Sequence, residues 1–290
     1  MDEVNRGRFR VAVAYGLALA AGLGVGAALR GLHPVAVAAL ADVAATVVVF
    51  GFSLAHDNSS LYDPYWSLAP IPITLYWASL SHGGPSLRQL SVLLLVAAWG
   101  IRLTLNWVRR WRGLRDEDFR YREIRGRTGR LYWPASFFSI HLMPTAWVFL
   151  GLLPLYPALS VPGPGFGALD AVAALVTLGA LVVETVADAQ LRRFLSARQD
   201  PQAVLDRGLW ALSRHPNYFG EVSFWWGLFL FGLAADRGSA CTVVGPLSIT
   251  LLFVLVSVPW MDRRMAARHP EWAGRLRGTP ALIPWPRRRR

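Results

Sequence analysis

The sequence contains no lysine, a single cysteine and few charged residues of either sign. All 30 basic residues are arginine, and charged residues make up only 17% of the chain, below the roughly 25% of an ordinary soluble domain. One cysteine, Cys241, excludes a disulfide framework and any multi-cysteine zinc site. Intrinsic disorder is excluded as well, because it requires low hydrophobicity and 54% of these residues are hydrophobic.

What the chain has instead is long apolar runs together with a net charge of +12. Runs of about 20 apolar residues match the hydrocarbon core of a bilayer. We predict an all-α, polytopic membrane bundle of about eight spans, with six as the alternative count because the third and seventh runs are weak. The eight runs are residues 11–29, 35–55, 65–81, 89–108, 136–156, 169–187, 217–235 and 241–260.

The distribution of arginine predicts how the spans are oriented. If the N-terminus is cytoplasmic, 26 arginines fall on the inner side and three in the outer loops. The inner segments are then residues 1–10, 56–64, 109–135, 188–216 and 261–290. This asymmetry follows the positive-inside rule and favours a cytoplasmic N-terminus and C-terminus. It also argues against nucleic-acid binding, for which arginines would spread over a soluble face.

A polar stripe lies at the predicted cytoplasmic end of the span 169–187. Glu184, Asp188 and Arg192 follow one another at intervals of four residues, so they share one face of a helix. Ionisable groups at membrane level are costly and usually mark ion pairs or sites. Two carboxylates and an arginine suit a polar cofactor with amine, ribose or amide groups. A purely structural stripe is the alternative.

The segment 208–221, GLWALSRHPNYFGE, gathers polar residues where a loop enters the span 217–235. Pro216 disfavours a regular helix through the residue before it. Arg214, His215, Asn217 and Tyr218 therefore lie close to the positive end of a helix, where their donors suit phosphate and amide groups. A structural turn is the other interpretation of this spacing.

The stretch SRHPNYFGE at 213–221 closely resembles the signature of the steroid 5-alpha reductase C-terminal-like proteins, especially their bacterial branch of unknown function. Four shorter stretches resemble the family in the same order: LYDPYW at 61–66, EDFRY at 117–121 with Arg125, ETVADAQLRRF at 184–194, and the arginine-rich segment 261–284. The resemblance divides the chain into N-terminal membrane helices (1–48), a reductase-like membrane enzyme domain (49–286) and a basic tail (287–290).

This resemblance implies an NADPH-dependent reductase of a steroid, enone or isoprenoid double bond, set in a bacterial inner membrane with its cofactor pocket facing the cytoplasm. The cofactor-binding residues that it implies, together with the stripe, are Glu184, Asp188, Arg192, Arg214, His215, Asn217, Tyr218, Glu221, Arg264 and Arg277. Steroid reductases pair an early glutamate with a tyrosine from a later helix. Asp63 corresponds to that glutamate, whereas Trp99 takes the place of the tyrosine, so Tyr62 and Tyr65 are the candidate proton donors.

Two other functions remain open at this point. Isoprenylcysteine carboxyl methyltransferase and phospholipid methyltransferases share a related Arg-His-Pro-x-Tyr core, which makes S-adenosylmethionine the alternative cofactor. A non-catalytic lipid-binding membrane protein is the third possibility. The expected partners are a hydrophobic small molecule or lipid and the membrane lipids, with no metal and no nucleic acid. The sequence names neither the substrate nor the oligomeric state.

Overall fold

The structure is a computed structural model that describes residues 2–81 and 84–285. Within these residues every regular element is helical, and seven helical stretches are long and apolar enough to cross a membrane. They are Glu3–Ala28, Pro34–Ala55, Leu87–Arg110, Phe119–Leu152, Ala168–Ala197, Pro216–Ala235 and Arg237–Arg268. The predicted all-α membrane bundle is confirmed, and seven lies within the expected range of six to eight.

The chain folds into two compact units, Met1–Pro162 and Gly163–Arg290. This division differs in kind from the predicted boundary at residue 48, which concerns where the family resemblance begins and stays a prediction. The predicted basic tail, 287–290, lies outside the described residues.

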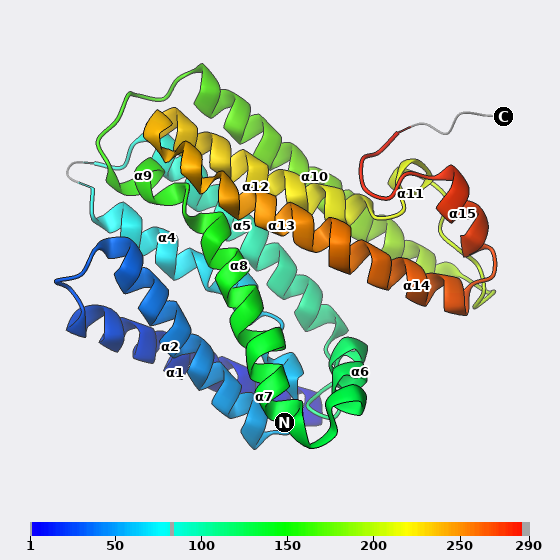
Figure 1. Cartoon of the computed structure of the whole chain (residues 1–290). Helices are drawn as coiled ribbons and strands as arrows, with labels where there is room; N and C mark the ends of the chain where they lie inside the picture. Colours follow the sequence, from blue (N-terminus) through cyan, green and yellow to red (C-terminus); the bar gives the residue numbers. More distant parts are fainter. Residues whose placement is uncertain (1, 82–83, 286–290) are drawn as a thin grey trace. The chain divides into compact units, whose positions relative to one another are not determined.

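The first unit is built from helices that run back and forth along one bundle (Figure 1). Its helices are α1 (Glu3–Ala28), α2 (Pro34–Ala55), α3 (Tyr65–Leu68), α4 (Pro70–Ser79), α5 (Leu87–Arg110), α6 (Phe119–Thr128), α7 (Tyr132–Ser136), α8 (Met143–Leu152) and α9 (Leu155–Ser160). A 3-10 turn, Ser59–Tyr62, precedes α3, and a π-helical turn, Phe137–Leu142, joins α7 to α8. Local signals begin these helices: the Asp2 side chain caps α1, and Ser86 with Gln89 forms a capping box at α5.

The predicted span 65–81 is two short helices, α3 and α4, rather than one long helix. Proline lacks the N–H of a helix interior, and Pro70 therefore stands at the first position of α4, where no N–H is needed. The pair still crosses the unit. At one end of the pair, Asn58 donates to the carbonyl of Leu114, just beyond the C-terminal end of α5. At the other end, α4 packs on α9, and α9 also accepts a hydrogen bond from Gln89 at the start of α5.

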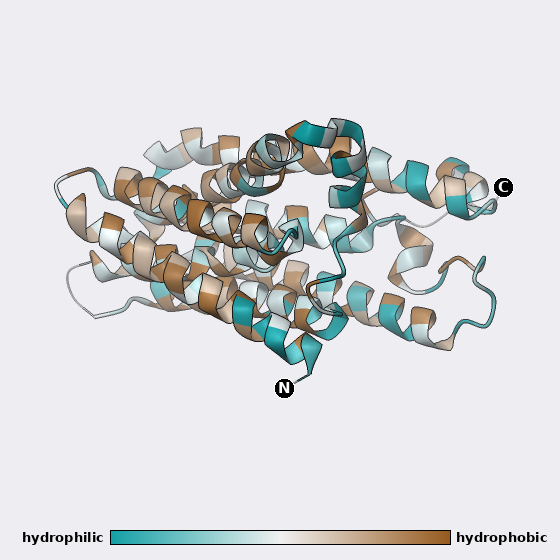
Figure 2. Ribbon diagram, turned by 90° about the horizontal axis from the view of Figure 1, so that it is seen from below, coloured by the Kyte–Doolittle hydropathy of each residue, from teal (hydrophilic) through white to brown (hydrophobic). Residues whose placement is uncertain are grey.

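The predicted cytoplasmic segments of the first unit meet at one end of it. Arg8 donates to the carbonyl of Val108 at 2.8 Å, and Arg115 pairs with Glu3 at 2.9 Å. Figure 2 shows the same change along the N-terminal helix, which is hydrophilic at its start and hydrophobic beyond. Segments 1–10, 56–64 and 109–135 thus share one polar end, as the arginine distribution requires. Which side of a membrane this end faces stays a prediction.

The second unit is dominated by two long helices packed side by side, α10 (Ala168–Ala197) and α12 (Pro216–Ala235) (Figure 1). Glycines allow the approach: a Cβ on Gly220 would lie 2.9 Å from the carbonyl oxygen of Ala180, and one on Gly227 would lie 3.0 Å from the amide nitrogen of Thr177. The remaining helices are α11 (Leu209–Leu212), α13 (Val244–Leu252), α14 (Val258–Arg268) and α15 (Trp272–Gly278). α10 continues ten residues past its predicted end, which keeps the whole polar stripe helical.

Candidate functional site

An acid and a phenol meet at the polar end of the first unit. Asp63 follows the 3-10 turn directly, and Tyr121 lies in the first turn of α6. The Tyr121 hydroxyl donates to Oδ1 of Asp63 at 2.5 Å, and both side chains are partly exposed. Asp118 starts α6 by accepting the Arg120 N–H at 2.8 Å, while its own N–H bonds the hydroxyl of Ser60. These caps fix Tyr121 over Asp63.

Asp63 is set up to hold a proton at neutral pH. Burial raises the pKa of its carboxyl to about 7, although the charge of Arg120 and the hydrogen bond from Tyr121 oppose this rise. The ordinary pKa of an aspartate is about 3.9. A carboxyl with a pKa near the working pH is suited to general acid–base chemistry. The pair therefore offers two exchangeable protons on one hydrogen-bonded unit.

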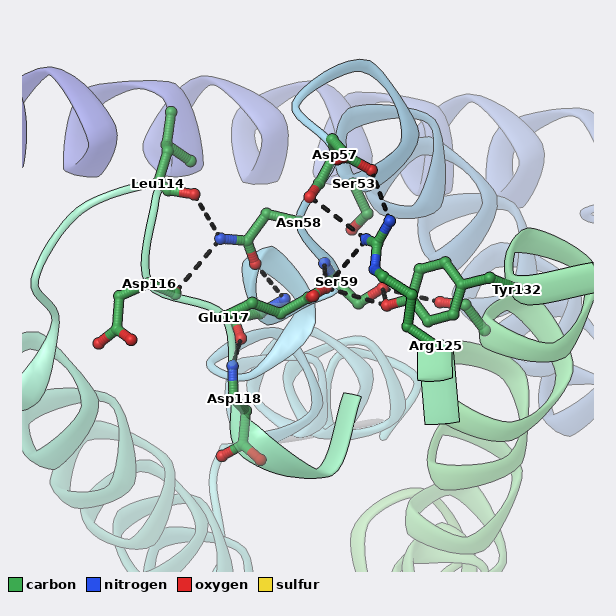
Figure 3. Close-up of polar contacts among 12 residues, drawn as sticks. Ser53, Asp57, Asn58, Ser59, Leu114, Asp116, Glu117, Asp118, Arg125 and Tyr132 are labelled. Atoms are coloured by element: carbon green, nitrogen blue, oxygen red, sulfur yellow. Dashed lines mark hydrogen bonds and ion pairs between the residues drawn. The ribbon is translucent and has the colours of Figure 1, made fainter. Parts of the chain in front are cut away.

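Beside this pair, a buried carboxylate holds the loop before α6 in place (Figure 3). Oε1 of Glu117 accepts from the Ser59 N–H and the Tyr132 hydroxyl, both at 2.9 Å, and from Arg125 at 3.4 Å. The Arg125 guanidinium lies 3.9 Å from the centre of the Tyr132 ring and pairs with Asp57 at 2.8 Å. The EDFRY stretch at 117–121, together with Arg125, thus folds the 109–135 segment onto the 56–64 segment.

The hydroxyls of the two predicted proton donors, Tyr62 and Tyr65, bond groups other than Asp63. The Tyr62 hydroxyl bonds Oγ1 of Thr145, and the Tyr65 hydroxyl donates to Oδ1 of Asp42, each at 2.7 Å. Among the described residues neither hydroxyl bonds Asp63. The partner of Asp63 is Tyr121, which the sequence placed inside a motif without assigning it a role. Trp99 is fully buried and packs edge-on against Trp66.

In the second unit, the SRHPNYFGE motif is organised around a carboxylate that the motif does not contain. Oδ1 of Asp262, on α14, accepts from His215 Nε2 at 3.0 Å and from the Trp272 indole at 3.2 Å. Nε and Nη2 of Arg214 donate to the two carboxylate oxygens of Asp262, at 3.2 and 2.9 Å. A two-bond guanidinium–carboxylate pair is geometrically specific and strong. Asp262 therefore joins α14 and α15 to the start of α12.

The C-terminal segment also runs along this motif. The backbone N–H groups of Arg214 and His215 donate to the carbonyls of Pro280 and Ala281, at 2.9 and 3.1 Å. The Ser213 hydroxyl donates to the carbonyl of Leu282 at 2.8 Å. Upstream, Gly208 adopts a positive φ of 59°, and the side chain of Gln190 accepts from the next N–H. Hydrogen bonds therefore hold the backbone N–H groups of the motif and of the turn before it.

The other predicted cofactor residues are distributed along this unit. His215 stacks on Tyr218, with ring centres 5.1 Å apart, and Glu221 accepts from the Trp225 indole at 2.9 Å. Glu184 is buried where α10 meets α12. Asn217 is partly exposed, and its side chain makes no hydrogen bond to another described residue. The remaining members are partly or fully exposed: Asp188, Arg192, Arg264 and Arg277.

Sequence reasoning missed Asp262, Trp272 and Arg275. Arg275 is buried, donates to the carbonyl of Trp210 and lies over the Trp272 ring, whereas its neighbour Arg277 is exposed. Asp262 is 48 positions from Arg214. No local pattern connects residues at that distance, so only the fold reveals the contact.

Comparisons with known proteins give a family but no described activity. Residues 49–274 match a family described as "Protein of unknown function (DUF1295)". A protein of Schizosaccharomyces pombe, itself described as uncharacterized, is 28% identical over 213 residues. That alignment covers 66% of this chain and 62% of the yeast protein, so the chain spans less than two thirds of that relative. No solved structure matches the chain.

Proposed function

The chain belongs to the DUF1295 family, and from that premise we propose that it is a membrane-embedded reductase of a lipid-like double bond. The observation that carries the proposal is the hydrogen bond between Asp63 and Tyr121. An acidic residue paired with a tyrosine is the constellation that the resemblance to steroid 5-alpha reductases leads one to expect. The tyrosine comes from α6 rather than from the position of Trp99.

The proposed reaction adds a hydride and a proton across an electron-poor carbon–carbon double bond. Reduced NADPH would supply the hydride and leave as NADP⁺. Tyr121 would donate the proton, and Asp63, with its raised pKa, would return a proton to the phenol. A positioned general acid of this kind contributes roughly 10²- to 10⁴-fold to a rate. The apolar helices would present the lipid, in a bacterial inner membrane with the cofactor on the cytoplasmic side.

The residues of the second unit fit a nucleotide cofactor in part. Carboxylates of the kind found at Glu184, Asp188 and Glu221 suit ribose and amide groups, and arginines suit phosphate. Asn217 and Arg277 have side chains without a hydrogen bond to another described residue, which leaves their donors available. All three guanidinium nitrogens of Arg214, in contrast, already donate within the chain. The proposal therefore assigns the cofactor to the other members of the predicted set.

Ligand-dependent thermal stability tests the cofactor directly. The full chain is purified in detergent, and its unfolding temperature is compared with NADPH, NADH, S-adenosylmethionine and no ligand. A ligand that binds only the folded state raises stability by mass action, by about 2.7 kcal/mol at 100 times its Kd. We expect the largest rise with NADPH.

The same measurement separates the two other functions. A rise with S-adenosylmethionine and none with NADPH would replace the reductase by a methyltransferase, for which the Asp63–Tyr121 pair has no required role. No rise with any nucleotide, together with a rise on adding lipid, would leave a lipid-binding protein without a cofactor.

A further inference from the structure

The side chains of Arg214 and His215 are hydrogen-bonded to other residues of the second unit. Arg214 is buried, and each nitrogen of its guanidinium has a partner in the second unit. Nε and Nη2 bond Asp262, while Nη1 donates to the carbonyl of Thr279 at 2.5 Å and to that of Leu276 at 3.4 Å. The last two groups lie at the C-terminal end of α15, where carbonyls lack helical partners. Arg214 thus caps α15 as well as pairing with α14.

His215 is fixed by the same carboxylate. Its Nε2 bonds Oδ1 of Asp262, which sets the proton on Nε2 when the ring is neutral. The ring then lies nearly parallel to Tyr218, with 12° between the planes. The orientation of Tyr218 in the first turn of α12 therefore depends on a residue of α14.

We propose that Arg214, His215 and Asp262 form a lock that fastens the C-terminal segment 272–285 to the start of α12. Asp262 is the positioning residue of this lock, because it orients both partners and touches no proposed substrate. The lock does not rest on the proposed function. It predicts that Arg214 serves the fold of the second unit rather than a cofactor phosphate.

Hydrogen exchange measured by mass spectrometry on the full chain in detergent tests the lock. The N–H groups of Arg214, His215 and Trp285 bond carbonyls across the contact, so peptides spanning 209–219 and 279–285 report on it. In Asp262→Asn we expect exchange in both peptides to quicken at least about tenfold, because hydrogen bonds to a charged group contribute that factor or more. A peptide from the middle of α10 is expected to stay at the wild-type rate.

Matched variants keep the test decisive. Arg263→Gln changes an exposed arginine next to Asp262 on α14 that lies outside the proposed cofactor set, and it is expected to leave all three peptides unchanged. Arg214→Lys keeps the charge but cannot bridge a carboxylate and two carbonyls at once, so it is expected to act like Asp262→Asn. If Asp262→Asn fails to fold, Arg214→Lys alone tests the lock. The double variant is expected to exchange no faster than either single one, since the two residues act through one contact.

A spectroscopic readout separates positioning from general stability. With ¹⁵N-labelled histidine, His215 is expected to carry its proton on Nε2 in the wild type, to populate both tautomers in Asp262→Ala, which removes the acceptor, and to regain Nε2–H in Asp262→Glu. An unchanged tautomer in Asp262→Ala overturns the positioning role.

Two results overturn the lock itself. One is a wild-type exchange rate at 279–285 in both Asp262→Asn and Arg214→Lys. The other is quicker exchange of that peptide when NADPH is added to the wild type, which would mean that a phosphate takes Arg214 from Asp262. Absence of NADPH binding, in contrast, defeats the proposed reductase and leaves the exchange result intact.

Discussion

The hydroxyl of Tyr121 donates to Oδ1 of Asp63 at 2.5 Å, across 58 positions of the sequence. The bond joins the start of α6 to the loop that ends the 3-10 turn, two segments that the chain brings together at the polar end of the first unit. It supplies an acid–phenol pair with a tyrosine other than Tyr62 and Tyr65, which the sequence offered as the proton donors.

Removing the phenol tests whether this pair moves a proton. Tyr121→Phe is expected to lower turnover by at least about 10²-fold, since a general acid contributes that much or more. NADPH oxidation with a 4-en-3-one steroid and with a polyprenyl enone measures the loss. Tyr15→Phe is the control, because it removes a hydroxyl that donates to the carbonyl of Leu61 and has no place in the proposed proton transfer. Equal activity in both variants would remove Tyr121 from the mechanism.

The raised pKa of Asp63 predicts how stability depends on pH. Between about pH 4 and pH 7 the folded chain keeps this proton, whereas the unfolded chain, with an ordinary aspartate, has lost it. The folded state binds more protons in this window, so stability falls as the pH rises through it. Asp63→Asn cannot ionise and is expected to flatten this part of the curve of unfolding temperature against pH. An unchanged slope in Asp63→Asn would show that the pKa of Asp63 is that of an ordinary aspartate.

Close packing of α10 on α12 predicts a strong effect of one methyl group. Gly227→Ala places a Cβ about 3.0 Å from the backbone of Thr177, which forces the helices apart. Overpacking of this kind typically costs about 1–3 kcal/mol. Gly179→Ala, on α10 with open space around it, is the matched control and is expected to be neutral or slightly stabilising. Thermal unfolding in detergent compares the two variants, and similar midpoints would contradict the close contact.

The Asn217→Ala variant tests whether Asn217 serves cofactor binding or folding. Its side chain makes no hydrogen bond to another described residue, so Asn217→Ala is expected to keep the unfolding temperature of the ligand-free protein. The rise produced by NADPH is expected to shrink, because an amide donor and acceptor are lost from the proposed cofactor set. Ser223→Ala changes a partly exposed residue of the same helix and serves as the control. A lower ligand-free midpoint in Asn217→Ala would make the residue structural.

Much of the fold follows from local patterns. Apolar runs of bilayer length place the long helices, and capping residues such as Ser86 mark where some of them begin. The exception, 65–81, shows the limit of hydropathy alone: the run is divided into α3 and α4, which begins at Pro70, although the chain still crosses the unit there. Hydropathy measures how apolar a segment is, and the backbone chemistry of proline decides where its helices begin and end.

The candidate site was less accessible from the sequence. Motif spacing pointed to Arg214 and His215, and the family resemblance to Asp63. Tyr62 and Tyr65 were then assigned as proton donors because they are neighbours of Asp63 in the chain. Both of these hydroxyls bond other groups of the bundle. The residues that complete the contacts, Tyr121 and Asp262, belong to segments far away along the chain.

The sequence by itself therefore determined that this is a helical membrane protein, because bilayer thickness acts on each segment separately. The positive-inside rule adds the prediction that its arginine-rich segments face one side. Only the tertiary structure decided which charged and phenolic groups meet. A contact such as Tyr121 with Asp63, or Arg214 with Asp262, depends on the rotation and register of packed helices. The rotation and register of packed helices are fixed by close approaches such as that of Gly227 to Thr177, and no periodic pattern in the sequence indicates such approaches.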